Sequence, residues 1–416
     1  MDIFILTNSP GEISAWVRPV VPRILERDSD ARVYIVLTPC PYASGREAQV
    51  VKDIPGIHRV INPDEWRTLT FLHPFPRAIL KVQDKGIVVH MGGDILNSAI
   101  FAKRLGLPAV AYTHRASRWR GPYKEYMVKD EKTKEYLLRR NLPSEMVTVV
   151  GDIMVDSVEI VRSREETRES LEIPSNAFVI SILPGSRPHE VKYMTPFLLK
   201  VAELVKKERA DVRFVLLLSP FASLDDLANA IDKTAVEQES NILSGTAGEV
   251  VDGVDGPEII TEKGTVIKIV REGHYDVMNS SDLALTCPGT KTAELAILGV
   301  PMVVITPLNK PELIPIDGIG NFVEKIPLVG KNLKGRLVMK FADRMEFVAL
   351  PNIKAERKIV PELVGILQPA DVAISTANLI ADEDLLARTS EELKKVMGSG
   401  GASEKVADII IRRADV

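Results

Sequence analysis

Residues 178–190, FVISILPGSRPHE, decide the fold of this chain. The first six are a mostly apolar run, which is typical of a buried strand, and the Pro-Gly pair that follows ends it in a loop. A few residues later, Thr195-Pro196 predicts a helix with threonine at its N-cap and proline at its first position. A strand, a glycine-containing loop and a helix in this order form the unit from which parallel α/β sheets are built.

The same alternation runs outward from this stretch in both directions. It predicts an α/β chain of two Rossmann-like, doubly wound domains that face each other across a cleft, followed by a helical tail. We place the N-terminal domain at 1–155, the second domain at 156–368 and the tail at 369–416, which we expect to pack back on the N-terminal domain. A β-hairpin inserted in the second domain is predicted at about 258–270. The runs with strand character are 3–6, 33–37, 87–90, 109–112, 126–129, 147–150, 178–183, 213–218, 283–286 and 302–306.

Composition excludes several classes of protein. Of 416 residues, 45% are hydrophobic and 26% are charged, which is typical of folded domains rather than disordered chains. The net charge of −4 gives no reason to expect nucleic acid as a partner. Cys40 and Cys287 cannot build a disulfide framework, and we recognise neither a signal peptide nor an apolar run of about 18 residues. We therefore expect a cytoplasmic protein without a transmembrane span.

Ligands of open α/β sheets bind at the carboxyl ends of the strands, so functional residues are expected in the loops there. In the loop after 178–183, Gly185 permits close backbone approach, Ser186 offers a hydroxyl and Arg187 can hold phosphate oxygens in a bidentate way. A plain turn with a surface arginine would also explain this loop. We nevertheless interpret it as a phosphate contact.

A second loop, at 287–294, follows another predicted strand and opens a helix. Gly289, Thr290 and Thr292 surround free N–H groups at the helix start, which attract anions, and Glu294 could accept hydrogen bonds from two ribose hydroxyls. A simple threonine cap is the alternative. Together, the two loops predict a site for a nucleoside diphosphate.

The first half offers two candidate general bases. Asp94 follows the strand at 87–90 and two glycines, which we expect to leave room for a substrate, although it could equally be a helix cap. Glu12 is the competitor, but Ser9 and Glu12 fit a capping box that would already occupy its oxygens. Gly11, beside it, permits a ligand to approach the loop.

Two further features concern metals and membranes. The six histidines are scattered without ligand spacing, so neither a metal site nor a cofactor is predicted. Residues 66–83, WRTLTFLHPFPRAILKVQ, combine aromatic and basic side chains without an acid, which suits a membrane interface. A core helix with a basic rim is the alternative interpretation.

Taken in order, these loops resemble the lipid-A-disaccharide synthase family of glycosyltransferases. The motifs that carry the resemblance are LPGSRPHE at 183–190, PGTKTAE at 288–294, LPNI at 350–353 and IVPEL at 359–363. The similarity of pattern extends from about residue 11 to about 379. It implies the GT-B fold and an inverting, metal-independent transfer of an acylated glucosamine from a UDP-sugar donor to a lipid-linked sugar acceptor. It also implies peripheral attachment to the inner face of the membrane, and it leaves a homodimer open.

The resemblance also implies roles for single residues of the second half. Arg187 and the 289–294 loop would hold UDP, and Glu190, the last residue of LPGSRPHE, would belong to the same nucleotide-binding set. Asn352 and Glu362 would line the nucleotide side of the cleft.

In the first half the match is less regular. Gly11, Glu12 and Ser14 fit the family's Gly-Glu-x-Ser, but Ala15-Trp16 stands where the family continues with Gly-Asp. Asp94 looks like the family's base near an Asp-x-Asn element, with a different local spacing. The hairpin at 258–270 is an apparent addition to the family pattern.

Two other functions fit the same two-domain architecture. One is a non-hydrolysing UDP-sugar epimerase, which would isomerise a UDP-sugar without an acceptor. The other is a non-catalytic relative that binds a sugar nucleotide or a lipid. Release of UDP only with an acceptor would indicate the transferase, isomerisation of the sugar alone would indicate the epimerase, and UDP binding with neither reaction would indicate the non-catalytic relative.

Overall fold

A computed structural model describes residues 1–416 with the exception of 41–44, 115–120, 312–334, 337, 341–343 and 416. The chain divides into two compact units. Unit 1 consists of Met1–Ser157 and Ser399–Val416, and unit 2 consists of Val158–Gly398. The chain therefore passes between the units twice, the first time close to the predicted boundary at 155/156.

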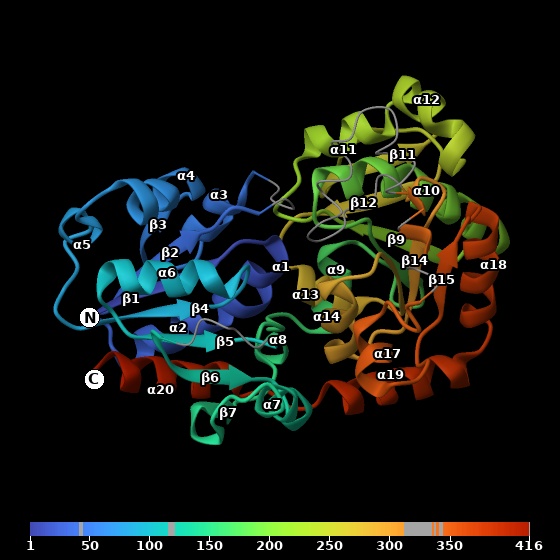
Figure 1. The fold of residues 1–416 in the computed structure, drawn as a ribbon. Coiled ribbons are helices and arrows are strands. Elements are labelled where there is room, and N and C mark those ends of the chain that lie inside the picture. Colours follow the sequence, from blue (N-terminus) through green and yellow to red (C-terminus); the bar gives the residue numbers. More distant parts are fainter. Residues whose placement is uncertain (41–44, 115–120, 312–334, 337, 341–343, 416) are drawn as a thin grey trace. The chain divides into compact units, whose positions relative to one another are not determined.

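Unit 1 is built around a parallel sheet with the order β3-β2-β1-β4-β5-β6-β7 in the described residues (Figure 1). The strands are β1 (Asp2–Thr7), β2 (Arg32–Leu37), β3 (Ile57–Ile61), β4 (Gly86–His90), β5 (Ala109–Tyr112), β6 (Tyr123–Val128) and β7 (Val147–Val149). All residues of β1 and β4 are buried, which shows that both faces of the sheet centre are covered. The strand order reverses between β1 and β4, and this is where doubly wound sheets bind ligands.

The helices of unit 1 connect these strands. They are α1 (Pro10–Glu12), the π-helix η1 (Ile13–Val17), α2 (Arg18–Arg27), α3 (Glu47–Lys52), α4 (Pro63–Arg67), the π-helix η2 (Thr68–Leu72), α5 (Pro76–Ile79), α6 (Ile95–Leu105), α7 (Glu131–Leu138), the 3-10 turn η3 (Ser144–Met146), α8 (Ile153–Asp156) and α20 (Ala402–Ala414). On one face, Phe101 and Leu105 of α6 pack against Phe4 and Leu6 of β1 in a common core. The C-terminal helix α20 packs against α2.

Unit 2 contains a mixed sheet with the order β10-β11-β12-β9-β8-β13-β14-β15 in the described residues. The strands are β8 (Phe178–Leu183), β9 (Val212–Leu217), β10 (Gly248–Gly253), β11 (Gly256–Thr261), β12 (Val266–Val270), β13 (Leu283–Thr286), β14 (Met302–Pro307) and β15 (Glu362–Gly365). The pairs from β12 to β15 are parallel, whereas β10, β11 and β12 pair antiparallel. The predicted hairpin therefore forms, with Ile259 opposite Ile267, but it extends the main sheet and gains β10 as a third strand.

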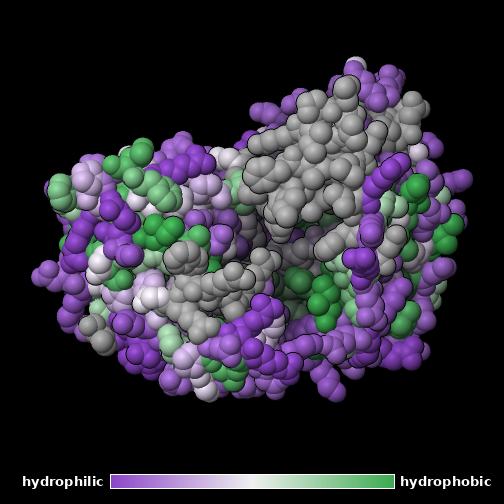
Figure 2. Space-filling model, in the orientation of Figure 1, coloured by the Kyte–Doolittle hydropathy of each residue, from purple (hydrophilic) through white to green (hydrophobic). Residues whose placement is uncertain are grey.

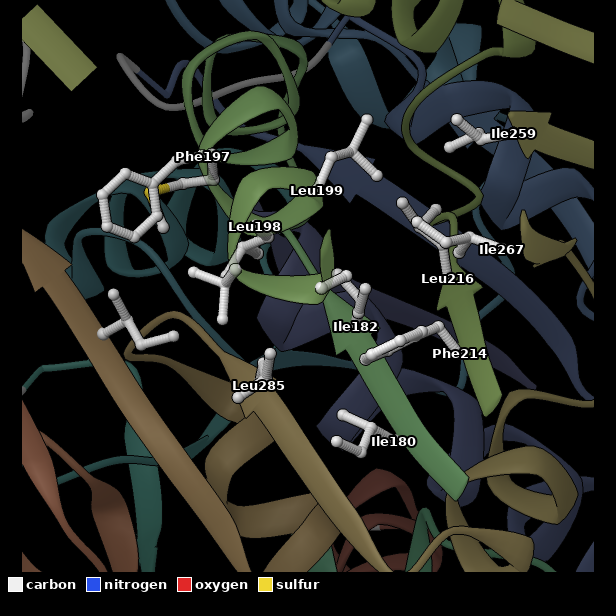
Figure 3. Packing of buried hydrophobic residues seen from close by; sticks show 14 of the residues in the cluster. Ile180, Ile182, Phe197, Leu198, Leu199, Phe214, Leu216, Ile259, Ile267 and Leu285 are labelled. Atoms are coloured by element: carbon white, nitrogen blue, oxygen red, sulfur yellow. The ribbon is translucent and has the colours of Figure 1, made fainter. Parts of the chain in front are cut away.

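The fully described helices of unit 2 are α9 (Arg164–Ser170), α10 (Pro188–Glu208), α11 (Leu224–Ile231), α12 (Lys233–Leu243), α13 (His274–Ser280), α14 (Thr290–Leu298), α17 (Leu350–Ala355), α18 (Pro369–Ile380) and α19 (Glu383–Met397). Their apolar faces complete the core of the unit. In Figure 3, Phe197, Leu198 and Leu199 of α10 lie over Ile182 of β8 and Leu285 of β13. This packing holds the carboxyl ends of β8 and β13 in a fixed place.

Two sequence-based expectations differ from the structure. The helix expected at Thr195-Pro196 begins earlier, because Pro188 already supplies the first-position proline and Pro196 lies inside α10. The tail predicted at 369–416 does not pack as one piece. The helix α18 joins the core of unit 2 through Val372 and Ile380, and of the tail's helices only α20 belongs to unit 1.

No helix in the described ranges is both long enough and apolar enough to cross a membrane.

Candidate functional site

The two predicted nucleotide loops lie next to each other in unit 2. Their strands, β8 and β13, pair in parallel with Leu183 beside Thr286, so the loops leave the sheet at the same edge. The thiol of Cys287 donates to the carbonyl oxygen of Pro184 at 3.5 Å and thereby links the loops directly. Burial raises the pKa of the Cys287 thiol, which keeps it protonated and unsuited to nucleophilic attack. The predicted pairing of the loops is therefore present in the structure.

Glu190 organises the first of these loops. Its Oε2 accepts the N–H groups of Ser186 (2.7 Å) and Arg187 (3.1 Å), and its Oε1 accepts Nη1 of Arg187 at 2.7 Å. Gly185 has φ +125°, and a Cβ at this position would overlap Glu190, so the loop requires glycine there. Glu190 thus shapes the loop and holds the Arg187 guanidinium at its rim, where it remains partly exposed.

The second loop presents an open helix start. Gly289 is the N-cap residue of α14 and has φ +135°, and no heavy atom of the described residues lies within 4 Å of the position that a Cβ would take. The described residues therefore leave the Cα of Gly289 uncovered at the start of α14, a helix end of the kind that can bind anions. Thr290, the first helical residue, is partly exposed. Thr292 is buried, donates to the Gly289 carbonyl at 2.8 Å and accepts Leu350 N–H at 3.1 Å, so its hydroxyl serves the loop itself.

Glu294 is a fully buried carboxylate one turn into α14. Its Oε2 accepts Nζ of Lys291 at 2.6 Å, whereas Oε1 has no hydrogen-bond partner among the described residues. Lys291, which the sequence analysis did not single out, also lies 5.8 Å from the ring centroid of Tyr275. Its spacing of three residues from Glu294 on a helix was the signal that could have identified the pair.

Asn352 and Glu362 hold together the segments around α17, whose first residue Leu350 binds Thr292 of the second loop. Asn352 is fully buried, donates to Val360 O and to Glu362 Oε1 (both 2.9 Å), and accepts from Val360 N–H (3.0 Å) and Ile359 N–H. Glu362 also accepts Ala349 N–H at 2.7 Å, just before α17. These two residues therefore fix α17 to β15, and the polar atoms of Asn352 are all used within the chain.

In unit 1, Asp94 occupies the N-cap of α6. Its Oδ1 accepts Leu96 N–H at 2.9 Å, and the residue is exposed. Among the described residues, Oδ2 accepts no hydrogen bond. The side chain therefore forms the helix cap that the sequence allowed, and its other oxygen makes no bond to the described residues, so the role of Asp94 as a base stays a prediction.

Glu12 contacts the loop that precedes Asp94, and both of its oxygens already accept hydrogen bonds. Its Oε2 accepts the N–H groups of Asn8 (3.2 Å) and Ser9 (3.3 Å) as well as the Thr7 hydroxyl (3.5 Å), and the capping box forms. Its Oε1 accepts Gly93 N–H at 3.1 Å, from the loop that precedes Asp94. Burial raises the pKa of Glu12, against the opposing effect of these hydrogen bonds.

The two glycines before Asp94 have a different purpose from the one expected. A Cβ on Gly92, which has φ +136°, would overlap the Glu12 carboxylate. A Cβ on Gly93 would lie 2.7 Å from Nδ2 of Asn8. The space beside the two glycines is therefore filled by Glu12 and Asn8 rather than left free for a substrate.

Gly11 and Ser14 lie where the first helix begins. Gly11 is in α1, and Ser14 is in the π-helix η1, where Arg18 N–H donates to Ile13 O instead of the carbonyl of Ser14. Both residues are partly exposed. Such π-turns are frequent at functional sites.

Buried residues that the sequence analysis missed fix the start of α6. His90, the last residue of β4, shares a hydrogen bond of 2.9 Å between Nδ1 and Oγ of Ser98, and burial lowers the pKa of His90 to about 3, so the imidazole is neutral. The Tyr123 hydroxyl donates to Ile95 O at 2.6 Å. Nothing in the sequence signals these contacts, because a lone histidine or tyrosine at a strand end has many possible partners.

The described residues contain no group of three or more His, Cys, Asp or Glu side chains that could hold a metal ion.

Comparison with known proteins relates the chain to one enzyme family in sequence. A family model described as lipid-A-disaccharide synthetase matches residues 139–246. The lipid-A-disaccharide synthase of Geobacter sulfurreducens is 27% identical over 272 residues, which cover 64% of this chain and 56% of that enzyme. That of Sulfurihydrogenibium sp. is 25% identical over 265 residues, covering 63% and 58%. The chain thus spans little more than half the length of these relatives, and the matches confirm the resemblance seen in its loops.

Solved structures are similar over the whole chain. The UDP-GlcNAc 2-epimerase of Neisseria meningitidis, solved with UDP-GlcNAc bound, has a TM-score of 0.55 and 14% sequence identity and covers 99% of this chain and 100% of that one. The UDP-GlcNAc 2-epimerase of Methanocaldococcus jannaschii has a TM-score of 0.52 and 14% identity, with the same coverage. At this level of identity the likeness concerns the fold alone, and it confirms the predicted GT-B class of two Rossmann-like units.

Proposed function

We propose that this chain, which is related to the lipid-A-disaccharide synthases, is a glycosyltransferase that moves an acylated glucosamine from UDP to a lipid-linked sugar. The observation that carries the proposal is the pair of neighbouring loops in unit 2. They combine a guanidinium at Arg187 with an open helix start at Gly289. This combination suits a diphosphate, and the sequence relationship supports a sugar as the group attached to it.

In this proposal unit 2 binds the UDP half of the donor. Gly185 and Ser186 bring the backbone close to the diphosphate, Arg187 contacts its oxygens, and the N–H groups at Gly289 and Thr290 complete the site. The positive end of the α14 dipole stabilises the negative charge that grows on UDP as the sugar departs. The free Oε1 of Glu294 would accept a hydrogen bond from a ribose hydroxyl once Lys291 moves aside.

Unit 1 would supply the general base. An inverting transfer needs one group to take the proton of the acceptor hydroxyl while that oxygen attacks the anomeric carbon and UDP leaves. Asp94 offers Oδ2 for this purpose, and its Oδ1 is held by Leu96 N–H so that the carboxylate keeps one orientation. Arg187 and the start of α14 would stabilise the negative charge on the departing UDP. No step of the proposed reaction uses a metal.

The test is acceptor dependence. Purified protein is incubated with UDP-diacylglucosamine, alone or with a glucosamine lipid monophosphate in detergent micelles, and UDP and lipid products are followed by mass spectrometry. We expect UDP and a lipid disaccharide only when both substrates are present. Isomerised UDP-sugar without an acceptor would identify an epimerase instead. Binding of UDP without either product would identify a non-catalytic relative.

A membrane surface is proposed as the place where the lipid substrates are met. Four apolar side chains of the 66–83 region form what we call the 71–79 patch: Phe71, Leu72, Phe75 and Ile79, with exposed fractions of 59%, 78%, 70% and 44%. Figure 2 shows apolar side chains at the surface where Figure 1 labels α4 and α5. This exposure supports the membrane interpretation over a core helix.

Replacing Phe71, Leu72 and Phe75 together with serine is expected to release the protein from lipid vesicles. Fully buried in lipid, each of these side chains would contribute about 1.5–3 kcal/mol, so the ratio of bound to free protein should fall by at least about 10²-fold. Arg77 stays unchanged in this variant, because it donates to the carbonyls of Leu105 (2.9 Å) and Gln83 (3.0 Å) and supports the local fold.

The measurement is co-sedimentation with vesicles of phosphatidylethanolamine and phosphatidylglycerol. A matched control replaces Val161, Val254 and Ile366, which are also strongly exposed apolar side chains but belong to unit 2, with serine. Equal sedimentation of the patch variant and the control would refute membrane contact at this patch.

A further inference from the structure

The same local arrangement opens both units. In each, the first strand is followed by a loop, a proline at the first helical position, and a glutamate two residues later that accepts loop N–H groups. These residues are Pro10 and Glu12 after β1, and Pro188 and Glu190 after β8. The two glutamates differ in one respect. The hydrogen bonds of Glu190 stay within its own loop, whereas Glu12 also binds Gly93 from the loop after the neighbouring strand β4.

The backbone of the loop after β4 is shaped to receive the Glu12 carboxylate. Gly93 N–H points at Oε1 of Glu12, and Gly92 lacks the Cβ that would overlap the carboxylate. Gly92 itself is buried, and its φ of +136° is a backbone conformation that favours glycine. Asp94 is the next residue after Gly93. The carboxylate of Glu12 is therefore attached one peptide unit away from the side chain that we assign as the base.

Other hydrogen bonds fix the backbone on the C-terminal side of Asp94, at the start of α6. Leu96 N–H holds its Oδ1, and the hydrogen bonds from Tyr123 to Ile95 and between His90 and Ser98 hold the first turns of α6. These contacts fix the helix that follows Asp94. Glu12 fixes the peptide that precedes it. Both are needed to define the backbone at Asp94, since the glycines before it have no side chains that could restrain them.

We propose that Glu12 is a positioning residue for the transfer reaction, which holds Asp94 in place through Gly93 N–H and does not itself exchange a proton with the substrate. This inference rests on the proposed function, in which Asp94 is the base. It assigns the two carboxylates that competed for that role to separate tasks. Three donors already point at Oε2 of Glu12, whereas Oδ2 of Asp94 accepts no hydrogen bond from the described residues.

The first experiment measures the contact without any substrate. Hydrogen–deuterium exchange of peptides that cover 91–97 is compared between the wild type and Glu12→Gln. We expect faster exchange in the variant. Glutamine keeps only one accepting oxygen, which the three donors at the Oε2 position would hold, so its NH2 group would face Gly93 N–H and could not accept from it. The matched control is Glu190→Gln, the equivalent change in unit 2, which should leave exchange at 91–97 as in the wild type. Unchanged exchange in Glu12→Gln would overturn the proposal.

The second experiment tests whether Glu12 acts through Asp94. Turnover of Glu12→Gln should fall by about 10²-fold, the scale that a misplacement of roughly 1 Å can cause, while its affinity for UDP stays at the wild-type value. In an Asp94→Asn background the same Glu12→Gln change should cost little further turnover, since there is no longer a base to misplace. A Glu12 effect of equal size in both backgrounds would overturn the positioning role.

The outcomes also separate this inference from the function on which it rests. If Asp94→Asn kept full turnover, the assignment of the base would fail while the exchange result could still stand. If Asp94→Asn lost turnover and Glu12→Gln did not, only the positioning role would fail. If Glu12→Gln did not fold, 15N-glycine labelling of the wild type replaces it, with Gly93 assigned by the Gly93→Ala variant. The Gly93 amide signal should then shift as the Glu12 carboxyl is protonated, and a signal that does not respond would overturn the proposal.

Discussion

Asp94→Asn is expected to lower turnover by about 10²–10⁴-fold, the usual scale of general-base catalysis, and to leave affinity for UDP unchanged. In the structure, this substitution changes the chemistry of Asp94 without removing a structural contact. Asparagine caps helices as well as aspartate does, so the bond from Leu96 N–H to the side-chain oxygen and the start of α6 should persist. What is lost is the ability of the other oxygen to take a proton. The nucleotide contacts belong to unit 2 and are not touched.

Initial rates with a demonstrated donor and acceptor, together with calorimetric titration of UDP, are the required measurements. Asp382→Asn is the matched control, because Asp382 is also an N-cap aspartate, at the start of α19 in unit 2, and its Oδ1 accepts Leu385 N–H at 2.9 Å. We expect wild-type turnover from this control. Near-wild-type turnover in Asp94→Asn would show that another group is the base, and a loss of UDP affinity would return Asp94 to a purely structural role as a helix cap.

The central strands and the loops that follow them could be read directly from the sequence. Strands such as β8 and β13 are buried on both faces, so they appear as continuous apolar runs. The strands that the sequence analysis missed, β3, β10 and β15, lie at sheet edges. Edge strands are covered on fewer sides, and their mixture of exposed and buried residues does not stand out from a loop.

The sequence indicated which positions are special, but it did not indicate why a particular residue type is needed at each of them. Gly92 and Gly93 were identified as special, but the side chains that require them come from Glu12 and Asn8, which are distant in sequence. Local patterns report spacing along the chain, and a contact between the loops of β1 and β4 depends on strand order, which those patterns do not contain. The same limit applies to the hydrogen bond between His90 and Ser98.

Pro196 shows how tertiary packing can override a local signal. A proline after threonine is a strong sign of a helix start, yet α10 passes through Pro196 without ending. The residues on either side, Thr195 and Phe197, are fully buried in unit 2. The loss of one helical hydrogen bond costs less than exposing the apolar face of α10 would.

Arg187→Ala is expected to weaken UDP binding by about 1.5–3 kcal/mol, or about 10- to 150-fold, the range for hydrogen bonds to charged groups. In the structure the guanidinium is paired with Glu190 at 2.7 Å, so a bound diphosphate would either share or replace this carboxylate partner. Sharing leaves the loop intact, because Glu190 keeps its bonds to the N–H groups of Ser186 and Arg187. We therefore expect the variant to fold normally and to lose affinity rather than structure.

Two further variants make the Arg187 result specific. Arg187→Lys keeps the charge but loses the planar, two-pronged contact, so its affinity should lie between those of the wild type and the alanine variant. Arg209→Ala removes an equally charged side chain at the other end of α10, where Arg209 pairs with Asp211 at 2.8 Å, and should leave UDP affinity at the wild-type value. Calorimetric titration at two salt concentrations completes the test, since a direct contact with the diphosphate makes the loss larger at low ionic strength. If Arg187→Ala bound UDP as tightly as Arg209→Ala, Arg187 would not contact the diphosphate, and the nucleotide would have to be placed elsewhere on unit 2.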